Sequence, residues 1–500
     1  MAEMEDLDDK MSPKILVIGA GIAGLATCDY LTKHGFTDFK VLEATSRTGG
    51  RIWSKNVDES CAINKNGMVE LGANWIHGIE RNPIYKIADE HDLLQLQRQG
   101  NLCQHSITVT ENGESVPSKI VKEVDWEYGK LMQKTEEFFQ HDMPTPYEND
   151  SVGSFLDREM EPTLKRYHGK DRKLRELIFW NRKNLETCIS GCHSMEEVSL
   201  QEIGSYEELP GIHYTIPPGF EAILDILKKQ IPAENLLMNH PVRTIHWNPK
   251  GEDVCVECEN GSKFYASHVI VTISLGVLKE KARTLFNPFL PELKVDAINK
   301  LAIGVVDKVI LEFDSPIVEP NLRNIQLLWD DIENDNADIS ESWVKKIHSF
   351  DVVQQTVLVG WLTGKEAMHM ETLSEEVVGE TCVKVLKKFL RRSDIPLPKK
   401  VIKTAWYSNP YTRGSYSFIP VGASIEDIEH LQEPLVNING KPNVLFAGEA
   451  THTSFYSSTH GALLTGQREA ETIVNYYMPN SDSSDHEYSA SPSGGCKFLL

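Results

Sequence analysis

The chain is 500 residues long, with 40% hydrophobic residues and a formal net charge of −22. The hydrophobic share is typical of a globular protein, and the length exceeds what one core usually serves, so we expect two domains. The excess of carboxylates argues against a nucleic-acid partner, because contacts with phosphates need basic patches. The same excess would raise the local concentration of cationic ligands, although it also serves simply to keep a protein soluble.

No segment favours a membrane span, a secretory signal or a metal site. The apolar runs are far shorter than the ~18 residues that a membrane helix needs, and the acidic N-terminus lacks the apolar stretch of a signal peptide. The nine cysteines are scattered, so we expect reduced thiols and a cytoplasmic location. A peroxisomal location is the alternative, but residues 497–500 match a Ser-Lys-Leu signal poorly.

The predicted elements alternate between strands and helices along most of the chain. Residues 14–18 form an apolar run that predicts a buried strand, 22–34 predict a helix, and 40–43 predict a second strand. Together they make a βαβ unit. The later elements are predicted as helices within 118–200 and at 219–229, 374–391 and 460–477, and as strands at 242–245, 254–257, 268–273, 305–313, 356–361 and 444–447.

Elements of one α/β domain at the start, middle and end of the chain indicate that a second domain is inserted in pieces. We predict a discontinuous dinucleotide-binding domain from residues 12–95, 212–295 and 415–478. The second domain, with α+β character, is expected from residues 96–211 and 296–414. Residues 1–11 and 479–500 are expected to be disordered tails. The C-terminal stretch is rich in Ser, Gly and Asp, a composition typical of disorder.

A glycine-rich turn lies between the first predicted strand and helix. Gly19, Gly21 and Gly24 form a GxGxxG motif, which is weak alone but here has a strand before it and a helix after it. The first glycine permits the tight turn, the second a close approach of the backbone to a pyrophosphate, and the third close packing of helix on strand. Glu43 ends the second strand, where a carboxylate accepts hydrogen bonds from ribose hydroxyls. The alternative is a glycine-rich turn without a ligand.

The next motif narrows the class of dinucleotide. Residues 43–52 read Glu-Ala-Thr-Ser-Arg-Thr-Gly-Gly-Arg-Ile. This segment is similar to the one that follows the first βαβ unit in FAD oxidases of the monoamine and polyamine oxidase superfamily. The resemblance runs from about residue 14 to 477 and implies FAD as cofactor. Gly50 permits close backbone approach, and Arg51 can neutralise pyrophosphate charge.

Two further segments resemble the parts of this family that face the flavin. Residues 70–78 look like the flavin-facing loop of polyamine oxidases, which implies that Asn74 and Trp75 lie near the cofactor and that His77 borders the substrate channel. Taken alone, such a histidine is more often a packed loop residue. Residues 305–313 resemble the strand that carries the family's flavin lysine. The resemblance implies that Lys308 lies near flavin N5, although an isolated lysine on a strand usually faces solvent.

The C-terminal part of the resemblance implies more cofactor contacts. Residues 446–452 are similar to the second FAD motif, in which Glu449 would accept from the ribityl chain. Ser458 or Thr459 is a plausible N-cap for a helix whose positive end would face the flavin. Val242 stands where the family holds adenine by backbone groups.

Residues 406–418 resemble the segment on the substrate side of the flavin. Tyr416 would stack beside the amine nitrogen that is oxidised, or else it is a core aromatic. Monoamine oxidases carry a flavin-linked cysteine just before the corresponding tyrosine, and Ser415 stands there in this chain. FAD is therefore expected to be bound non-covalently.

The resemblance implies an FAD-dependent amine oxidase that uses oxygen and forms an aldehyde and hydrogen peroxide. Glu197 and Ser199 match the acidic and hydroxyl residues of the spermine oxidase branch, where acetylpolyamine oxidases are apolar. An ammonium end of spermine needs acceptors, so we expect oxidation of spermine to spermidine, 3-aminopropanal and peroxide. The alternatives are an N1-acetylpolyamine oxidase, a non-catalytic FAD-binding scaffold, and a solvated surface role for Glu197. We expect no metal, and a monomer or weak oligomer.

Overall fold

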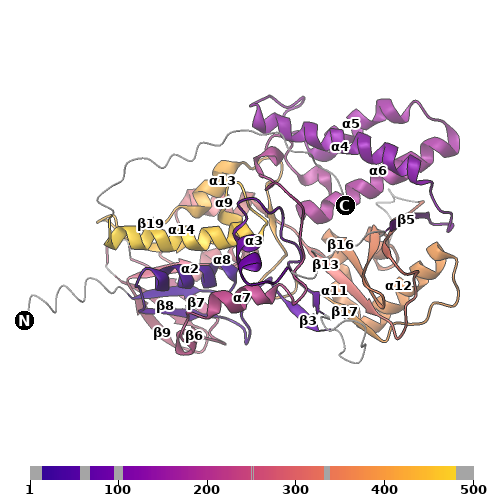
Figure 1. Ribbon diagram of the computed structural model, residues 1–500. Coiled ribbons are helices and arrows are strands. Elements are labelled where there is room, and N and C mark those ends of the chain that lie inside the picture. The colour runs from indigo at the N-terminus through magenta and orange to yellow at the C-terminus, as the bar shows by residue number, and fades with distance from the viewer. Residues whose placement is uncertain are drawn as a thin grey trace, which may run out of the picture.

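The computed structural model describes residues 14–56, 68–94, 105–248, 250–251, 253–330 and 338–479. Figure 1 shows a parallel sheet with its helices at one end of the molecule, and a second sheet with a helical bundle at the other. Of the predicted tails, 1–11 and 479–500, only Pro479 is among the described residues. In the part of the chain that the structure describes, no helix is long and apolar enough to cross a membrane.

The first sheet collects strands from the start, middle and end of the chain. β1 pairs in parallel with β2 on one side and β10 on the other, with Ile15 opposite both Phe39 and His268. β1 and β10 are buried at every position, as expected of strands covered on both faces. In spatial order the strands are β19 (Leu435–Val436), β20 (Pro442–Phe446), β10 (His268–Val271), β1 (Ile15–Ile18), β2 (Phe39–Leu42) and β6 (Leu236–Leu237).

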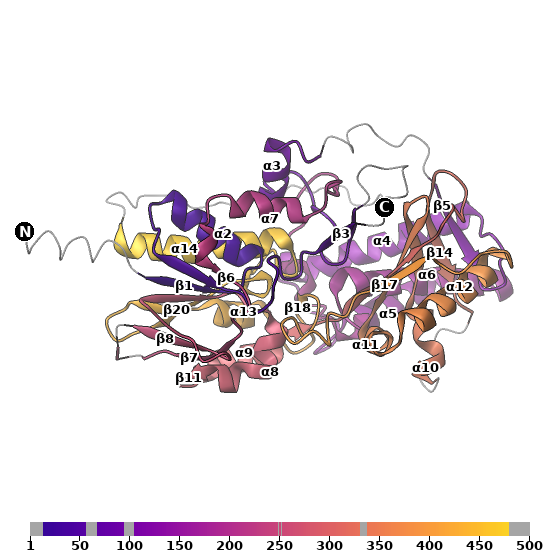
Figure 2. The ribbon, with the colours of Figure 1, turned by 90° about the horizontal axis from the view of Figure 1, so that it is seen from below.

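Helices cover one face of this sheet (Figure 2). Among these helices, α2 packs tightly on α14: a Cβ on Gly466 would lie only 2.1 Å from the Ala23 carbonyl oxygen. Only a glycine allows the two helices to approach this far. The covering helices are α2 (Ile22–Lys33), α3 (Pro83–Glu90), α7 (Glu221–Lys228) and α14 (Thr459–Tyr477).

A four-stranded sheet and three helices cover the other face of the parallel sheet. Their apolar side chains, among them Phe286 and Phe446, form one buried cluster. The sheet consists of β11 (Phe286–Asn287), β7 (Val242–His246), β8 (Val254–Cys258) and β9 (Lys263–Ala266), and the helices are α8 (Leu275–Leu285), α9 (Glu292–Lys300) and α13 (Ile425–Gln432).

The second six-stranded sheet is mainly antiparallel. Its second strand, β13, is buried at all seven positions because β17 and β16 flank it and both faces are covered. In spatial order the strands are β17 (Lys400–Lys403), β13 (Val306–Glu312), β16 (Val357–Thr363), β15 (Ser349–Gln354), β14 (Leu322–Leu328) and β5 (His105–Thr110). The helices of this region are α10 (Ile339–Ser342), α11 (Gly364–Thr372), α12 (Glu375–Leu390) and the bundle α4 (Ser118–Gln140), α5 (Val152–Leu164) and α6 (Gly169–Ser190).

Short elements connect the two regions. The β12–β18 ladder pairs Ala302 with Phe418, and the β3–β4 ladder pairs Ser54 with Glu70. These ladders are β3 (Ser54–Asn56), β4 (Met68–Glu70), β12 (Ala302–Ile303) and β18 (Ser417–Phe418), and the 3₁₀ turns are η1 (Met195–Glu197), η2 (Ile203–Ser205), η3 (Ala233–Asn235), η4 (Trp343–Lys346) and η5 (Glu449–Thr451).

The predicted α/β fold class is confirmed, and most predicted elements are present within a few residues. The strand predicted at 268–273 ends at Val271, because Ser274 caps α8 by accepting from the Val277 N–H at 3.3 Å. The strands β5, β14 and β15 were missed. The boundaries of the two predicted domains stay a prediction.

Candidate functional site

The glycine-rich turn leaves the N-terminus of α2 open for a ligand. Gly19 has φ +106°, a conformation that favours glycine. A Cβ on Gly24 would lie 2.1 Å from the Gly19 carbonyl oxygen, so the third glycine is required by packing. Gly21 is the N-cap and offers no side-chain cap, and the first N–H groups of a helix have no intrahelical partner. This arrangement fits a pyrophosphate.

Glu43 lies beside this turn. Its Oε2 accepts from the Ala20 N–H at 2.9 Å, and its Oε1 accepts from the N–H and hydroxyl of Thr45 at 2.9 and 2.7 Å. The Glu43 carbonyl accepts from the His240 N–H at 2.8 Å, which brings the chain leading to Val242 against the same edge. Val242 is partly buried at the start of β7. Glu43 and the chain leading to Val242 are thus brought to one edge of the glycine-rich turn, and their roles toward ribose and adenine stay predictions.

The loop after β2 packs on the turn. Gly49 forms a bridge with Gly21, and a Cβ on Gly50 would lie 3.7 Å from the Gly21 Cα. The sequence analysis missed Arg47, which stabilises this loop by donating to the carbonyls of Thr48 and Ile52 at 3.1 Å. The signal in the sequence that could have identified Arg47 is its position in the same segment as Arg51, four residues earlier.

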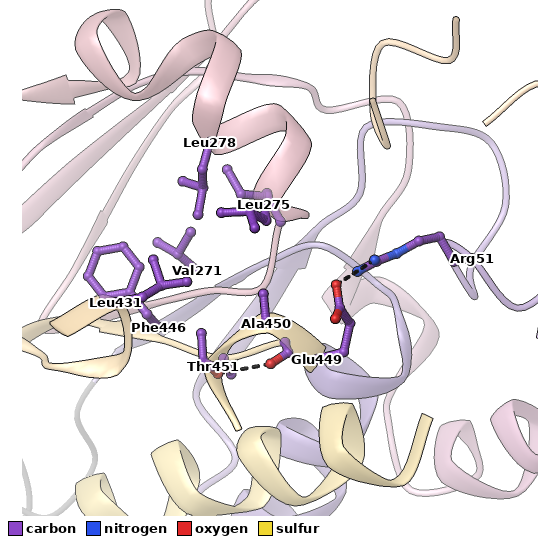
Figure 3. A pocket seen from close by; sticks show the side chains of 12 residues that line it. Arg51, Val271, Leu275, Leu278, Leu431, Phe446, Glu449, Ala450 and Thr451 are labelled. Carbon is purple, nitrogen blue, oxygen red and sulfur yellow. Dashed lines mark hydrogen bonds and ion pairs between the residues drawn. The ribbon is translucent and has the colours of Figure 1, made fainter. Parts of the chain in front are cut away.

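Arg51 joins this loop to the end of β20. Its Nη1 donates to Glu449 Oε1 at 2.7 Å and to the Ser415 carbonyl at 2.8 Å. Figure 3 shows the ion pair at one side of a pocket, with the apolar side chains of Val271, Leu278 and Phe446 gathered at the other side. The guanidinium predicted to meet a pyrophosphate is therefore bound to the second predicted FAD motif.

Glu449 is almost fully buried and accepts several hydrogen bonds. Besides Arg51, its partners are the Ser417 N–H and hydroxyl at 3.2 and 2.6 Å and the Ser457 N–H at 2.9 Å. The following helix begins as predicted: Ser458 is the N-cap of α14 and accepts from the Gly461 N–H at 3.0 Å, and Thr459 is the first helical residue. The carboxylate and the helix end therefore lie next to each other in sequence and in space.

Lys308 is buried and not solvent-facing. Its Nζ donates to the carbonyls of Glu70 and Gly72 at 2.8 and 2.7 Å, both in the loop predicted to face the flavin. Burial lowers the pKa of Lys308 to about 7, and the carboxyls of Glu70 and Asp351 oppose this shift. The structure therefore brings together the lysine and the loop, which are more than 230 residues apart in sequence.

His77 is a neutral imidazole at physiological pH. Burial, and to a smaller extent the nearby imidazole of His213, lower the pKa of His77 to about 4. The two rings are 5.2 Å apart. Asn74 and Trp75 precede it as partly buried loop residues. Burial and the neighbouring imidazoles of His77 and His452 lower the pKa of the buried His460 to about 3. His213 and His460 were missed because no motif marks them.

The predicted substrate residues lie on two segments that run side by side. Val198 forms a bridge with Pro420, the Ser199 N–H donates to the Ile419 carbonyl at 3.2 Å, and the Val421 N–H donates to the Glu197 carbonyl at 2.9 Å. Tyr416 donates its hydroxyl proton to the Cys188 carbonyl. Burial raises the pKa of Tyr416 well above its usual value, so the phenol is neutral.

Glu197 and Ser199 differ in exposure. Ser199 is buried, whereas Glu197 is exposed and its Oε2 accepts from the His193 N–H at 3.0 Å. The 3₁₀ turn η1 ends at Glu197 and leaves this side chain outside the core, as the alternative of a solvated side chain expects. An exposed carboxylate attracts a cationic ligand less strongly than a buried one, because solvent screens its charge.

A family model of flavin containing amine oxidoreductases matches residues 22–474. The chain is 38% identical to the peroxisomal N(1)-acetyl-spermine/spermidine oxidase of Bos taurus, covering 94% of this chain and 96% of the relative. It is also 38% identical to the human protein of the same name, over 93% and 96% of the two chains.

More distant relatives extend the comparison. Human lysine-specific histone demethylase 2 is 26% identical over 94% of this chain but only 54% of its own length. Among solved structures, a redesigned putrescine oxidase superposes with a TM-score of 0.67 at 18% identity, covering 93% of this chain and 99% of the other. At that identity the superposition shows a shared fold.

Proposed function

This chain belongs to the flavin-containing amine oxidoreductase family and is an FAD-dependent amine oxidase, and we propose that its substrates are N1-acetylated polyamines. The observation that carries the proposal is the 38% identity, over nearly the whole of both chains, with two oxidases named for N1-acetylspermine and N1-acetylspermidine. Oxygen is the expected electron acceptor, and an aldehyde and hydrogen peroxide are the expected products.

The residues of this chain fit such a reaction. Bound FAD supplies the electron acceptor, while the protein binds and orients the amine and excludes water. A buried ammonium on Lys308 would stabilise negative charge that develops beside it. The imidazole of His77 and the phenol of Tyr416 are both neutral, so neither adds a charge that would repel a cationic amine or hold it too tightly in the predicted substrate channel.

Spermine is the second candidate, and one feature favours it. Glu197 offers a carboxylate and Ser199 a hydroxyl on the segment that runs beside residues 419–421. A free ammonium end has three donors and no acceptor, so it gains from such groups more than an acetylated end does. The exposure of Glu197 limits this gain, because solvent screens the charge.

One experiment separates these candidates. The purified holoenzyme is mixed anaerobically with N1-acetylspermine, spermine, spermidine, benzylamine or a methyl-lysine peptide, and the loss of flavin absorbance is followed. Fastest reduction by N1-acetylspermine supports the proposal. Fastest reduction by spermine replaces it with the second candidate, and reduction by the peptide alone points to a demethylase. A flavin that none of the amines reduces would mark a non-catalytic FAD-binding scaffold.

The location of the protein is a separate proposal. The scattered cysteines, which are free where the structure describes them, support a cytoplasmic site. The two relatives are named as peroxisomal proteins. Fluorescence microscopy of the chain tagged at its N-terminus, with a peroxisomal marker, distinguishes the two.

A further inference from the structure

A line of polar side chains crosses the second sheet and ends at Lys308. Its members come from four adjacent strands: Asn324 on β14, Asp351 on β15, Trp361 on β16 and Lys308 on β13. Asn324 is directly opposite Asp351, and Trp361 is directly opposite Lys308. Direct cross-strand neighbours share a face of the sheet, so the line lies on the face that carries the predicted flavin lysine.

Each neighbour in the line contacts the next. The Asn324 amide donates to Asp351 Oδ1 at 2.6 Å, and the Trp361 indole N–H donates to Asp351 Oδ2 at 3.0 Å. The Lys308 Nζ lies 4.3 Å from the centre of the Trp361 ring. The ring face is attracted to a cation, and a carboxylate that accepts from the indole N–H increases the negative charge of that face.

The geometry leaves Lys308 little rotational freedom. Its Nζ has three N–H donors, and two of them bind the Glu70 and Gly72 carbonyls. The Trp361 ring closes a third side. The apolar residues around it, among them Val69, Leu71 and Ile310, form a small buried cluster against which Trp361 packs. These contacts therefore fix the direction in which the third N–H of Lys308 points.

We propose that Trp361 and Asp351 are positioning residues for Lys308: the indole face holds the ammonium in place, and the Asp351 carboxylate fixes and polarises the indole. Asn324 in turn holds Asp351. The proposal rests on the role of Lys308 toward FAD, and it holds for an acetylated or an unmodified polyamine alike. The ionisable groups that face Lys308 are the carboxyls of Glu70 and Asp351, which favour its protonated form against burial.

The test measures the two-electron midpoint potential of bound FAD between pH 5.5 and 9, with no amine substrate present. A cation beside the flavin favours the reduced form. A plot of the midpoint potential against pH should therefore change slope where Lys308 loses its proton, near its pKa of about 7. This change of slope is called the bend below. In W361L this bend should move to lower pH by about one unit, a tenfold change in the proton affinity of Lys308. W361F keeps a ring but loses the indole N–H, and D351N keeps an acceptor but loses the charge, so both should show a smaller shift in the same direction.

A matched control removes another indole bond of the same sheet. Trp329 is buried, and its indole N–H donates to the Ile347 carbonyl at 3.0 Å while its ring packs on Phe389. W329F should lower thermal stability without moving the bend. A bend at the same pH in W361L, W361F and the wild type would overturn the proposal. Should W361L fail to hold FAD, W361F and D351N decide the matter, and unchanged bends in both would also overturn it. Substrate preference does not enter this measurement, so its outcome is independent of the proposed function.

Discussion

Lys308 and Lys294 are held in the same way in two different parts of the molecule. Each ammonium donates to two backbone carbonyls: Glu70 and Gly72 for Lys308, and His430 and Leu431 for Lys294. Each lies 4.3 Å from the centre of an aromatic ring, and burial lowers the pKa of each to about 7. Lys294 therefore offers a matched control for the function of Lys308.

Replacing Lys308 by methionine should slow the flavin half-reactions by about 10²-fold, the usual scale for losing one preorganised electrostatic contact at a reacting centre. Methionine keeps most of the stem volume, so FAD should remain bound. Lys294→Met should cost comparable thermal stability and leave the half-reactions unchanged. Stopped-flow measurement of reduction and reoxidation in both variants checks this, and equal rates in the Lys308→Met variant and the wild type would contradict the role of Lys308.

Replacing Glu197 by leucine should lower kcat/KM for spermine by about 10-fold, the low end for a charged hydrogen bond, because this carboxylate is exposed. N1-acetylspermine should be oxidised as well as before or better. The neighbouring Glu196 is also exposed but binds the hydroxyls of Ser151 and Ser154, so Glu196→Leu serves as the control and should not change the ratio of the two substrates. The measurement is steady-state peroxide production, and an unaltered ratio in Glu197→Leu would exclude contact with the substrate end.

Replacing Glu449 by glutamine should weaken FAD binding by about 10- to 100-fold, since one amide cannot accept from Arg51 and from the two serines at once. Titration of the apoprotein with FAD, followed by flavin fluorescence, gives the dissociation constants. The exposed ion pair of Arg413 and Glu280 provides the control, because Glu280→Gln removes a similar charge contact in solvent. The same dissociation constant for Glu449→Gln and wild type would show that the network does not support the cofactor site.

Acid should destabilise the parallel sheet through His268. This fully buried histidine lies with Nδ1 2.6 Å from the Pro442 carbonyl and Nε2 2.8 Å from the Tyr477 hydroxyl, and burial lowers its pKa to about 4. The pKa of His268 in the folded protein lies below the unfolded value of about 6.5. The contribution of His268 to the free energy of unfolding is therefore fully present above pH 6.5 and is lost as the pH falls toward and through 4.

By about pH 5 the loss should reach about 2 kcal/mol. Thermal unfolding between pH 8 and 5 measures it. His268→Gln should be less stable at pH 8 and show a shallower fall with pH, while the exposed His34→Gln should follow the wild type. If the stability of His268→Gln falls with pH as steeply as that of the wild type, His268 is not the cause of the acid sensitivity.

FAD should be released on acid precipitation and remain in the supernatant. Ser415 stands where monoamine oxidases carry a linking cysteine, and its hydroxyl is engaged with the backbone of Val306, accepting from the N–H at 2.8 Å and donating to the carbonyl at 2.9 Å. Yellow peptide after proteolysis of the pellet would show a covalent link. A Ser415→Ala variant should also release its flavin.

The sequence predicted best the parts of the fold that are local. The strand, glycine turn and helix at residues 15–33 depend on neighbours in sequence, so periodicity and motif suffice. The strands β5 and β14 were missed because they are stabilised by pairing with each other across more than 200 residues, with Ile107 opposite Ile325. Their side chains show no clean alternation, since one strand lies at the sheet edge and the other next to it.

The same limit applies to the site. Motif resemblance predicts that Lys308, His77 and Glu449 lie near the cofactor, but it could not predict which groups of the protein bind these three side chains. The burial of Lys308 depends on strands β16 and β17 packing on both sides of β13, and the ion pair of Arg51 with Glu449 joins residues 398 positions apart. The exposure of Glu197 likewise depends on where η1 ends relative to the helical bundle.

The packing of α14 on α2 has a consequence for biosynthesis. The glycine-rich turn and α2, which ends at Lys33, leave the ribosome early. The helix that packs on them, α14, begins only at Thr459. At ordinary elongation rates this interval lasts roughly 20–90 s. During that time the apolar face of α2, including Ala23 and Leu25, has no partner from α14, and Arg51 has no Glu449. A nascent chain of this protein therefore cannot complete the predicted FAD site until almost all of it has been made. Until then the exposed apolar face of α2 can bind chaperones that shield apolar surface.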